Sequence, residues 1–455
     1  MSDLLFEIGT EEIPAGYLAP AIDQLVVAVR KLLEERRLPA ERVWGAGTPR
    51  HLTVAASGIP GQQPAVREEI IGPPAKVAFN QDGSPGKAAV GFARAQGVPV
   101  EGLIVKQTAK GPYVAAAIER GGASATQVLP DVLREAALSV SFPKSMRWPV
   151  PSSGPAIRFA RPIRWLVALL DAELLRLDVA GVEAGRATYG HPFLAPGPLE
   201  LDGADYDAYR NALRERFVVV DMDERKDLVR RQVEHMLGAD GEHTEWVDPL
   251  WEVVNLVEWP HAVEGTFDEK FLQVPDAIVC AAMIEHQRYF PVWDKAGKLL
   301  NRFVVVSNRG PEQEETVREG NERVLRARLE DARFFWEEDR ATPLDERVPR
   351  LAGVVYLGGL GNNLQRTERL EELSARVARM MKLERKQTES VRRAAHLCKA
   401  DLLTGLVGEF PGLQGMVGRE LLFSMADADW SSDDVYRVAI AKRALPSKRR
   451  RQPCS

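Results

Sequence analysis

Residues 318–340 read REGNERVLRARLEDARFFWEEDR, and this stretch says more about the fold than any other part of the chain. Leu325, Leu329 and Ala332 stand three or four residues apart, and Phe335 and Trp336 continue the series. Such spacing places apolar side chains along one face of an α-helix. We therefore predict a long amphipathic helix here.

The other positions of this helix carry six arginines and seven carboxylates, so its charged surface is nearly neutral. Three pairs of opposite charge stand four residues apart, a spacing at which side chains pair along a helix. The pairs are Glu319 with Arg323, Glu322 with Arg326, and Arg333 with Glu337. Two interpretations stay open: a solvated helix with its own ion pairs, or a row of guanidinium groups offered to phosphates or to a partner's carboxylates.

The N-terminal part of the chain alternates strand-like and helix-like patterns. Residues 4–8 form a short apolar run, and residues 15–37 carry apolar side chains at helical spacing. A second strand is expected at 48–56, after a Gly/Pro turn at 45–49. This mixture predicts an α+β domain.

The whole chain of 455 residues is long enough for about two to four domains. PVPSSGP at 149–155 is the clearest linker-like stretch, and from residue 318 the pattern becomes almost entirely helical. We predict an α+β multidomain fold, with mixed α/β N-terminal and central domains followed by an all-helical region. The predicted boundaries are 1–148, 149–315, 316–430, and a basic, disordered tail at 431–455.

Composition limits the classes of partner. The chain is 45% hydrophobic and 27% charged, as in an ordinary soluble globular protein, and its net charge is -5. A negative chain has no overall attraction to nucleic acid, so any RNA contact must come from a local basic patch.

Three cysteines lie far apart, without the spacing of a zinc site or a disulfide framework, which fits a reducing cytosol. No apolar run approaches the roughly 20 residues of a membrane helix. The acidic N-terminus does not resemble a signal peptide. We expect a cytoplasmic protein without a membrane partner.

Two neighbouring segments, FPKSMRW at 142–148 and RFARPIRW at 158–165, interleave cations with aromatic residues. Their cations could contact a nucleic-acid backbone, while Trp148 and Trp165 could stack on bases. In the alternative interpretation, the tryptophans belong to the core and the arginines lie against their edges. The cations concerned are Lys144, Arg147, Arg158, Arg161 and Arg164.

EHQRYF at 285–290 holds a glutamate, a histidine and an arginine, but a single histidine is more often structural than catalytic. HLCKAD at 396–401 suggests a metal-dependent HD phosphohydrolase. On one helix, however, His396 and Asp401 would be about 140° apart, and no adjacent His-Asp pair exists. Phosphate-binding glycine loops and nucleophile elbows are also missing, so the chain offers no self-contained active site.

Nine ordered segments stand out along the chain: LLFEIGTEEIPAGY at 4–17, GTPRHLTV at 47–54, GPPAKVAF at 72–79, FPKSMRW at 142–148, RFARPIRWLVALL at 158–170, LVEWPHAV at 256–263, EHQRYFPV at 285–292, VREGNERVLRARLEDARFFWEEDR at 317–340, and KADLLTGLVGEFPGLQGMVGR at 399–419. Together they closely resemble the β subunit of the bacterial heterotetrameric glycyl-tRNA synthetase. The set is highly specific, although no single segment would suffice.

The resemblance implies a division of labour. In this family an α subunit carries the catalytic core that activates glycine with ATP and Mg, and the β subunit binds glycine tRNA and holds a heterotetramer of two α and two β chains together. It also implies an HD-like fold without metal ligands for the helical region, and no cofactor bound by this chain. The candidates for contact with tRNA or the α subunit are Lys144, Arg147, Arg158, Arg164, Arg288, Arg323, Arg326 and Arg328.

After about Glu420 the resemblance fades, whereas family members continue into an anticodon-binding domain. We expect a chain that is shortened at its C-terminus, with an incomplete helical domain, and a frameshift is one hypothesis for its origin. A metal phosphohydrolase of the HD type and a pure protein-interaction scaffold remain the alternatives.

Overall fold

The computed structural model describes residues 1–80, 83–108, 111–120, 122–149, 156–238, 242–244 and 249–425. Most of the predicted linker and all of the predicted tail lie outside these residues. The chain divides into unit 1, Met1–Arg225 with Asn255–Trp259, and unit 2, Lys226–Val254 with Pro260–Ser455. Both units contain helices and sheets, so the predicted α+β multidomain fold is confirmed. The predicted domain boundaries stay a prediction.

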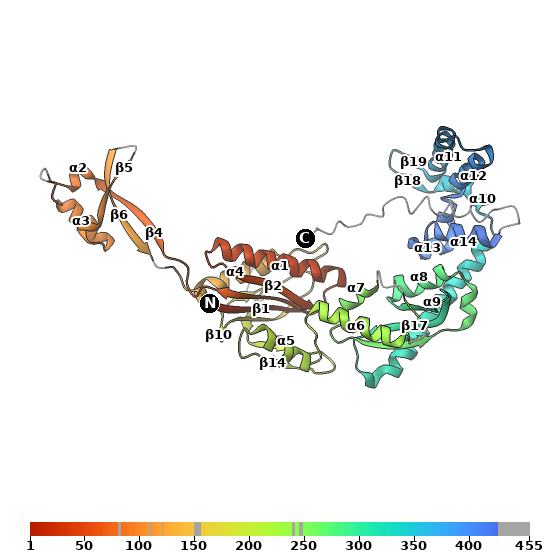
Figure 1. The fold of residues 1–455 in the computed structure, drawn as a ribbon, viewed down its shortest axis with the longest axis horizontal. Coiled ribbons are helices and arrows are strands. Elements are labelled where there is room, and N and C mark those ends of the chain that lie inside the picture. Colours follow the sequence, from red (N-terminus) through yellow and green to blue (C-terminus); the bar gives the residue numbers. More distant parts are fainter. Residues whose placement is uncertain are drawn as a thin grey trace. The chain divides into compact units, whose positions relative to one another are not determined.

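Unit 1 is built on a sheet whose strands follow the order β11-β12-β9-β1-β3-β2, with β10 also paired to β9. Figure 1 labels β1, β2 and β10 of this sheet. The central strand β1 pairs antiparallel with β3 on one side and with β9 on the other, and only β12 runs parallel to its neighbour. The strands are β1 (Ser2–Thr10), β2 (Arg42–Thr48), β3 (His51–Ile59), β9 (Ile163–Leu170), β10 (Glu173–Leu174), β11 (Asp178–Val179) and β12 (Val182–Gly185).

Both faces of this sheet are covered, which explains why β1 is buried at every position from Leu4 to Thr10. Successive side chains of a strand point to opposite faces. Leu4, Phe6 and Ile8 pack with helices α1 (Ala15–Glu35) and α4 (Ala125–Ser139). Leu5 packs on the other face with residues of α5 (Tyr206–Glu215), and Glu7 therefore also points to that side. The predicted strand at 4–8 and helix at 15–37 are confirmed.

The turn predicted at 45–49 is wrong, because β2 continues to Thr48 and the chain reverses at Pro49 and Arg50. The two glycines serve close packing instead. A Cβ at Gly45 would lie 2.4 Å from the Ile22 side chain of α1, and one at Gly47 would lie 2.4 Å from a backbone oxygen of β3. Glycine in a strand often marks such an approach.

Three smaller sheets also belong to unit 1. One has the order β4-β6-β5 and packs with two helices around a core of Ala78, Ala89 and Val114; the other two are the ribbons β7–β8 and β13–β14. The bounds are β4 (Val66–Pro74), α2 (Ala75–Ala78), α3 (Lys87–Gln96), β5 (Leu103–Thr108), β6 (Gly111–Arg120), β7 (Met146–Trp148), β8 (Ile157–Phe159), β13 (Ala187–Tyr189) and β14 (Pro198–Glu200).

Unit 2 contains a three-stranded antiparallel sheet in the order β15-β17-β16. One face packs with α8 and α9, and the other packs with α6 and α7. In α9 the residues Leu325, Leu329, Ala332 and Trp336 are buried, which confirms the predicted amphipathic helix. The elements are α6 (Met222–Met236), α7 (Pro249–Val254), β15 (His261–Thr266), α8 (Asp276–Gln287), β16 (Phe290–Trp293), β17 (Leu299–Ser307) and α9 (Glu314–Arg340).

The remainder of unit 2 is mostly helical, as predicted, with one short hairpin. Asp339, near the end of α9, accepts hydrogen bonds from the first two backbone amides of α13 and pairs with Arg347. The elements are α10 (Leu344–Arg347), β18 (Val355–Leu357), β19 (Gly361–Asn362), α11 (Asn363–Met380), α12 (Arg385–Leu397), α13 (Gly405–Glu409) and α14 (Met416–Met425). An HD-like fold for this region stays a prediction.

Candidate functional site

A closed polar cluster lies on the α5 side of the central sheet of unit 1. Glu7 of β1 is at its centre and is fully buried. Its carboxylate accepts hydrogen bonds from Thr188 at 2.8 Å, from Tyr209 of α5 and from Trp165 of β9. A buried carboxylate is stable only where such donors replace water. One side chain thus ties together four elements of unit 1.

Glu258, from the second stretch of unit 1, completes the cluster. Its carboxylate accepts hydrogen bonds from Thr48 at 2.6 Å and from Arg50 at 2.6 and 3.0 Å. The fully buried ring of His51 lies between the two carboxylates: Nδ1 is 3.4 Å from Glu7, and Nε2 is 3.6 Å from Glu258. We call these residues, with Thr188, Tyr209 and Trp165, the buried carboxylate cluster.

The charges in this cluster support one another. Burial alone would raise the pKa of Glu7, but the His51 ring and the hydrogen bonds that Glu7 accepts lower it below its ordinary value. Burial likewise opposes ionisation of Glu258, and His51 and Arg50 outweigh it, so that the pKa of Glu258 is also lowered. Burial and the Glu7 charge raise the pKa of Tyr209, which therefore stays a hydrogen-bond donor. The cluster is built to hold ionised carboxylates inside the protein.

Sequence reasoning did not identify this cluster, although a signal for it was present. Glu7, His51 and Glu258 lie in three of the nine segments that carry the family resemblance, at 4–17, 47–54 and 256–263. Because these side chains are fully or almost fully buried, a ligand cannot reach them directly. Their role is to fix the strands and the Asn255–Trp259 segment of unit 1.

The β7–β8 ribbon displays the first group of predicted contact residues. Arg147 and Arg158 stand directly opposite each other in the register, and both are exposed, as is Lys144. Arg158 donates to Ser145 at 3.3 Å. Within the described residues, no carboxylate pairs with Lys144, Arg147 or Arg158. Like charges directly opposite each other destabilise a strand pair, so this ribbon carries a local excess of positive charge.

The two tryptophans next to these cations are half-buried, and each is engaged with the protein. Trp148 donates to the backbone oxygen of Phe159 at 3.2 Å and packs on the core, and Trp165 donates to Glu7. The alternative interpretation of the motif is therefore correct for the tryptophans, which are not free stacking surfaces. Arg164 is exposed and pairs with Glu11 at 3.3 Å, and Arg161 donates to backbone oxygens.

In unit 2, two of the predicted contact residues are held by ion pairs. Arg288, at the C-cap of α8, pairs with Glu252 at 2.8 Å. Arg328 of α9 pairs with Glu409 at 3.2 Å. Side chains engaged in this way are less available to a partner.

Arg323 and Arg326 differ from these two, since both are exposed on α9 and pair with no carboxylate among the described residues. Of the three pairs predicted along α9, Arg333 with Glu337 forms at 2.8 Å. Glu322 instead accepts from the backbone amide of Thr266 at 2.8 Å. Neither predicted interpretation of α9 describes the whole helix. Arg333 pairs within the helix, as on a solvated helix, whereas Arg323 and Arg326 have no carboxylate partner among the described residues.

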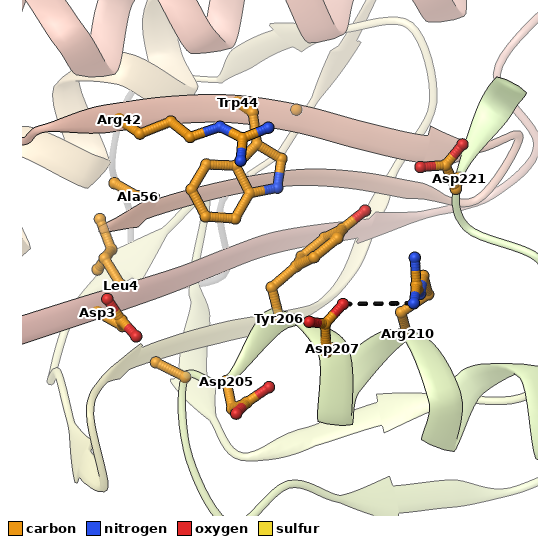
Figure 2. A pocket seen from close by; sticks show the side chains of 12 residues that line it. Asp3, Leu4, Arg42, Trp44, Ala56, Asp205, Tyr206, Asp207, Arg210 and Asp221 are labelled. Atoms are coloured by element: carbon orange, nitrogen blue, oxygen red, sulfur yellow. Dashed lines mark ion pairs between the residues drawn. The ribbon is translucent and has the colours of Figure 1, made fainter. Parts of the chain in front are cut away.

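A second feature of unit 1 is an open pocket of about 450 Å³ between β2 and α5 (Figure 2). Trp44 of β2 and Tyr206 of α5 meet edge to face, with ring centroids 5.5 Å apart. The Arg42 guanidinium lies 4.7 Å from the centroid of the Trp44 ring. On the α5 side, Asp207 pairs with Arg210 at 3.3 Å. No pattern in the sequence pointed to this pocket.

The predicted shared helix for His396 and Asp401 is wrong, because α12 ends at Leu397. His396 lies 2.6 Å from Glu371, whereas buried Asp401 accepts from the backbone amide of Gly415. The described residues contain no group of three or more acidic, histidine or cysteine side chains arranged to hold a metal ion. Among the helices of the described residues, none combines the length and apolar character needed to cross a membrane.

Comparison with known proteins gives a consistent family. A sequence model of the family described as glycyl-tRNA synthetase beta subunit matches residues 4–452. Proteins named glycine–tRNA ligase beta subunit are similar to this chain. The one from Moorella thermoacetica is 45% identical over 91% of this chain and 59% of its own length. The one from Desulforamulus reducens is 40% identical over 95% of this chain and 62% of its own length. The one from Geobacter metallireducens is 39% identical over 98% of this chain and 64% of its own length.

The chain thus spans about three fifths of the length of these relatives. The family match also continues past Glu420, where we expected the resemblance to fade, so that expectation is wrong.

Proposed function

This chain belongs to the glycyl-tRNA synthetase beta subunit family, and on that premise we propose that it binds glycine tRNA and positions it for a separate catalytic α subunit. In this proposal the α subunit forms glycyl-adenylate from glycine and ATP with Mg, and the terminal hydroxyl of the tRNA then attacks it. The chain itself supplies no reacting side chain and no cofactor. Its place of action is the cytoplasm, in an assembly of two α and two β chains.

Positioning alone can make a large contribution to such a reaction. Holding two reactants in attack geometry is worth about 7–11 kcal/mol in the most favourable cases, without any chemical group from the positioning subunit. A tRNA is positioned mainly through its phosphates, which guanidinium and ammonium groups bind with strong salt dependence. The proposal therefore requires exposed cations that are not already neutralised by the protein.

The observation that carries the proposal is the cross-strand pair of Arg147 and Arg158 in the β7–β8 ribbon, with Lys144 nearby in sequence. The repulsion between facing guanidiniums costs free energy in the isolated chain. A phosphate placed against them would relieve that repulsion. The ribbon is for this reason the favoured RNA contact in unit 1.

Arg323 and Arg326 on α9 provide a second exposed cationic surface, in unit 2. Guanidinium groups suit either phosphates or carboxylates, so this surface serves tRNA or the α subunit. Arg288 and Arg328 rank below them because each already has a carboxylate partner. Arg164 ranks lower for the same reason.

The decisive experiment measures binding of glycine tRNA as a function of salt, by the chain alone and after co-purification with the α subunit. Replacing Arg147 and Arg158 with glutamine should make the dependence of log Kd on log salt shallower, by about 0.7–0.9 for each phosphate that the variant no longer neutralises. The matched control replaces Lys31 and Arg36, two exposed cations of unit 1 that already pair with Glu35 and Glu135.

An unchanged slope in the Arg147/Arg158 variant, or an equal change in the control, would contradict the assignment to the ribbon. Absence of tRNA binding at low salt, both alone and with the α subunit, would favour the interaction scaffold instead. Glycine-charging assays of the same complexes then test the positioning role: the ribbon variant should lose charging rate at low tRNA concentration, whereas glycine-dependent ATP–pyrophosphate exchange should not change.

A further inference from the structure

The pocket between β2 and α5 has walls suited to a specific class of ligand (Figure 2). Its volume of about 450 Å³ lies in the range of small-molecule sites. Trp44 and Tyr206 line it with aromatic surface, and both rings are only half-buried. Tyr206 also lies 6.1 Å, ring to ring, from Tyr209 of the buried carboxylate cluster, so this wall rests on a rigid part of the core.

Charged side chains in the lining are mainly acidic. Four aspartates face two arginines, and one of the aspartates, Asp207, is neutralised by Arg210. The carboxylate of Asp3 has no partner among the described residues. Asp221 uses Oδ1 to accept the backbone amides of Asp223 and Glu224 at 2.9 and 3.0 Å, and its charge also acts on the buried Arg225 guanidinium, so Asp221 is partly compensated. Carboxylate charge thus remains available to a ligand.

One observation besides this charge points to a cation. The Arg42 guanidinium already lies over the Trp44 ring, so the pocket wall holds one cation of the chain against an aromatic face. Burial first, and then the Asp221 carboxylate, raise the pKa of Tyr206 to about 12, whereas Arg210 opposes this, so Tyr206 stays a neutral ring. A phosphate-bearing ligand would meet repulsion in the same place.

We propose that this pocket binds an organic cation, an ammonium or guanidinium group on a short carbon chain, against Tyr206 and Trp44 and opposite the carboxylates of Asp3 and Asp221. The ligand is either a free small molecule or a basic side chain of another protein. The binding is independent of the tRNA proposal, because it uses a different surface of unit 1 and the opposite charge.

Isothermal titration calorimetry of the full chain at low ionic strength tests this, since salt weakens exposed ion pairs. Agmatine probes the free small molecule, and a blocked Ala-Arg-Ala tripeptide probes the protein side chain. The same peptide with citrulline in place of arginine keeps the shape without the charge. Asp3→Asn and Asp221→Asn should each weaken binding of the cation by about 1.5- to fivefold, the usual range for an exposed ion pair.

Asp23→Asn is the matched control, because Asp23 is an exposed aspartate of α1 outside the pocket lining. Trp44→Phe tests the aromatic wall with little loss of packing. Binding of agmatine identifies a free ligand, and binding of the arginine peptide alone identifies a protein partner; both support the proposal. It is overturned if neither cation binds, if the citrulline peptide binds as well as the arginine peptide, or if Asp23→Asn weakens binding as much as Asp3→Asn.

Discussion

Replacement of Glu258 by alanine is the sharpest test of how unit 1 is held together. Glu258 is 2% exposed, accepts three hydrogen bonds from Thr48 and Arg50, and lies 3.6 Å from His51. Removing one partner from a buried ion pair leaves the other charge uncompensated and costs about 3–5 kcal/mol. We expect Glu258→Ala to destabilise unit 1 by about that amount.

Thr48→Val removes the hydroxyl that donates to Glu258 at 2.6 Å and accepts the backbone amides of Arg50 and His51 at 3.2 Å. Hydrogen bonds to a charged group are worth about 1.5–3 kcal/mol, so this variant should lose roughly half as much as Glu258→Ala. The double variant should cost less than the sum of the two single variants, because Thr48 donates to the carboxylate only while Glu258 is present. Glu34→Ala, at an exposed position of α1, serves as the control and should change stability by less than about 0.5 kcal/mol.

Hydrogen exchange measured by mass spectrometry suits this chain, because a protein with more than one unit need not unfold in a single step. Peptides from β1, β3 and residues 255–259 report on the cluster, and peptides from α11 and α12 report on unit 2. Faster exchange confined to the first group is expected. A change below about 1 kcal/mol for Glu258→Ala, or equal changes in both groups, would refute the view that Glu258 fixes this part of unit 1.

Three further perturbations follow from the same structure. The folded-state pKa values of Glu7 and Glu258 are lowered, so the stability that these carboxylates contribute is present above the unfolded-state pKa near 4.3 and is lost as pH falls through the folded-state values. Acid titration of unit 1 should show this loss of stability. A Glu7→Gln variant whose stability changes with pH as in the original chain would contradict this prediction. Asp339→Ala removes two amide hydrogen bonds at the start of α13 and a buried ion pair. The free energy of unfolding of unit 2, measured by thermal unfolding, should therefore fall by about 3–5 kcal/mol. A loss under about 1 kcal/mol would show that the Asp339 cap is dispensable. Gly47→Ala places a Cβ 2.4 Å from a backbone oxygen and should destabilise unit 1 by about 1–3 kcal/mol. Gly16→Ala is the control, because a Cβ there has open space around it and should not destabilise the unit. Equal melting temperatures of the two variants would refute the close-packing role of Gly47.

The structure divides the predicted contact residues into those without a carboxylate partner among the described residues and those that already have one. Lys144, Arg147 and Arg158 are exposed and unpaired with carboxylates among the described residues, as the RNA-binding hypothesis requires. Arg288 and Arg328 are engaged with Glu252 and Glu409, which no spacing along the sequence could reveal. Whether any of them contacts tRNA is decided by the salt-dependence experiment.

Local patterns were sufficient for some elements. The three- and four-residue spacing of Leu325, Leu329 and Ala332 predicted α9 because an amphipathic helix is determined by residues close in sequence. The same reasoning predicts a turn at 45–49 and is wrong there, because Gly45 and Gly47 lie within β2. These glycines lack a side chain, which lets α1 and β3 pack closely against β2. That packing arises only when the chain is folded.

The amino-acid sequence by itself determined the family, the α+β character and the position of the long helix, because these depend on neighbouring residues and on whole segments. Only the tertiary structure brought Glu7 and Glu258 to opposite sides of His51 and set Arg147 opposite Arg158. Thr48 and Glu258, which share a hydrogen bond, are 210 residues apart in the chain. Contacts at such separations follow from strand register and packing, which no local spacing encodes.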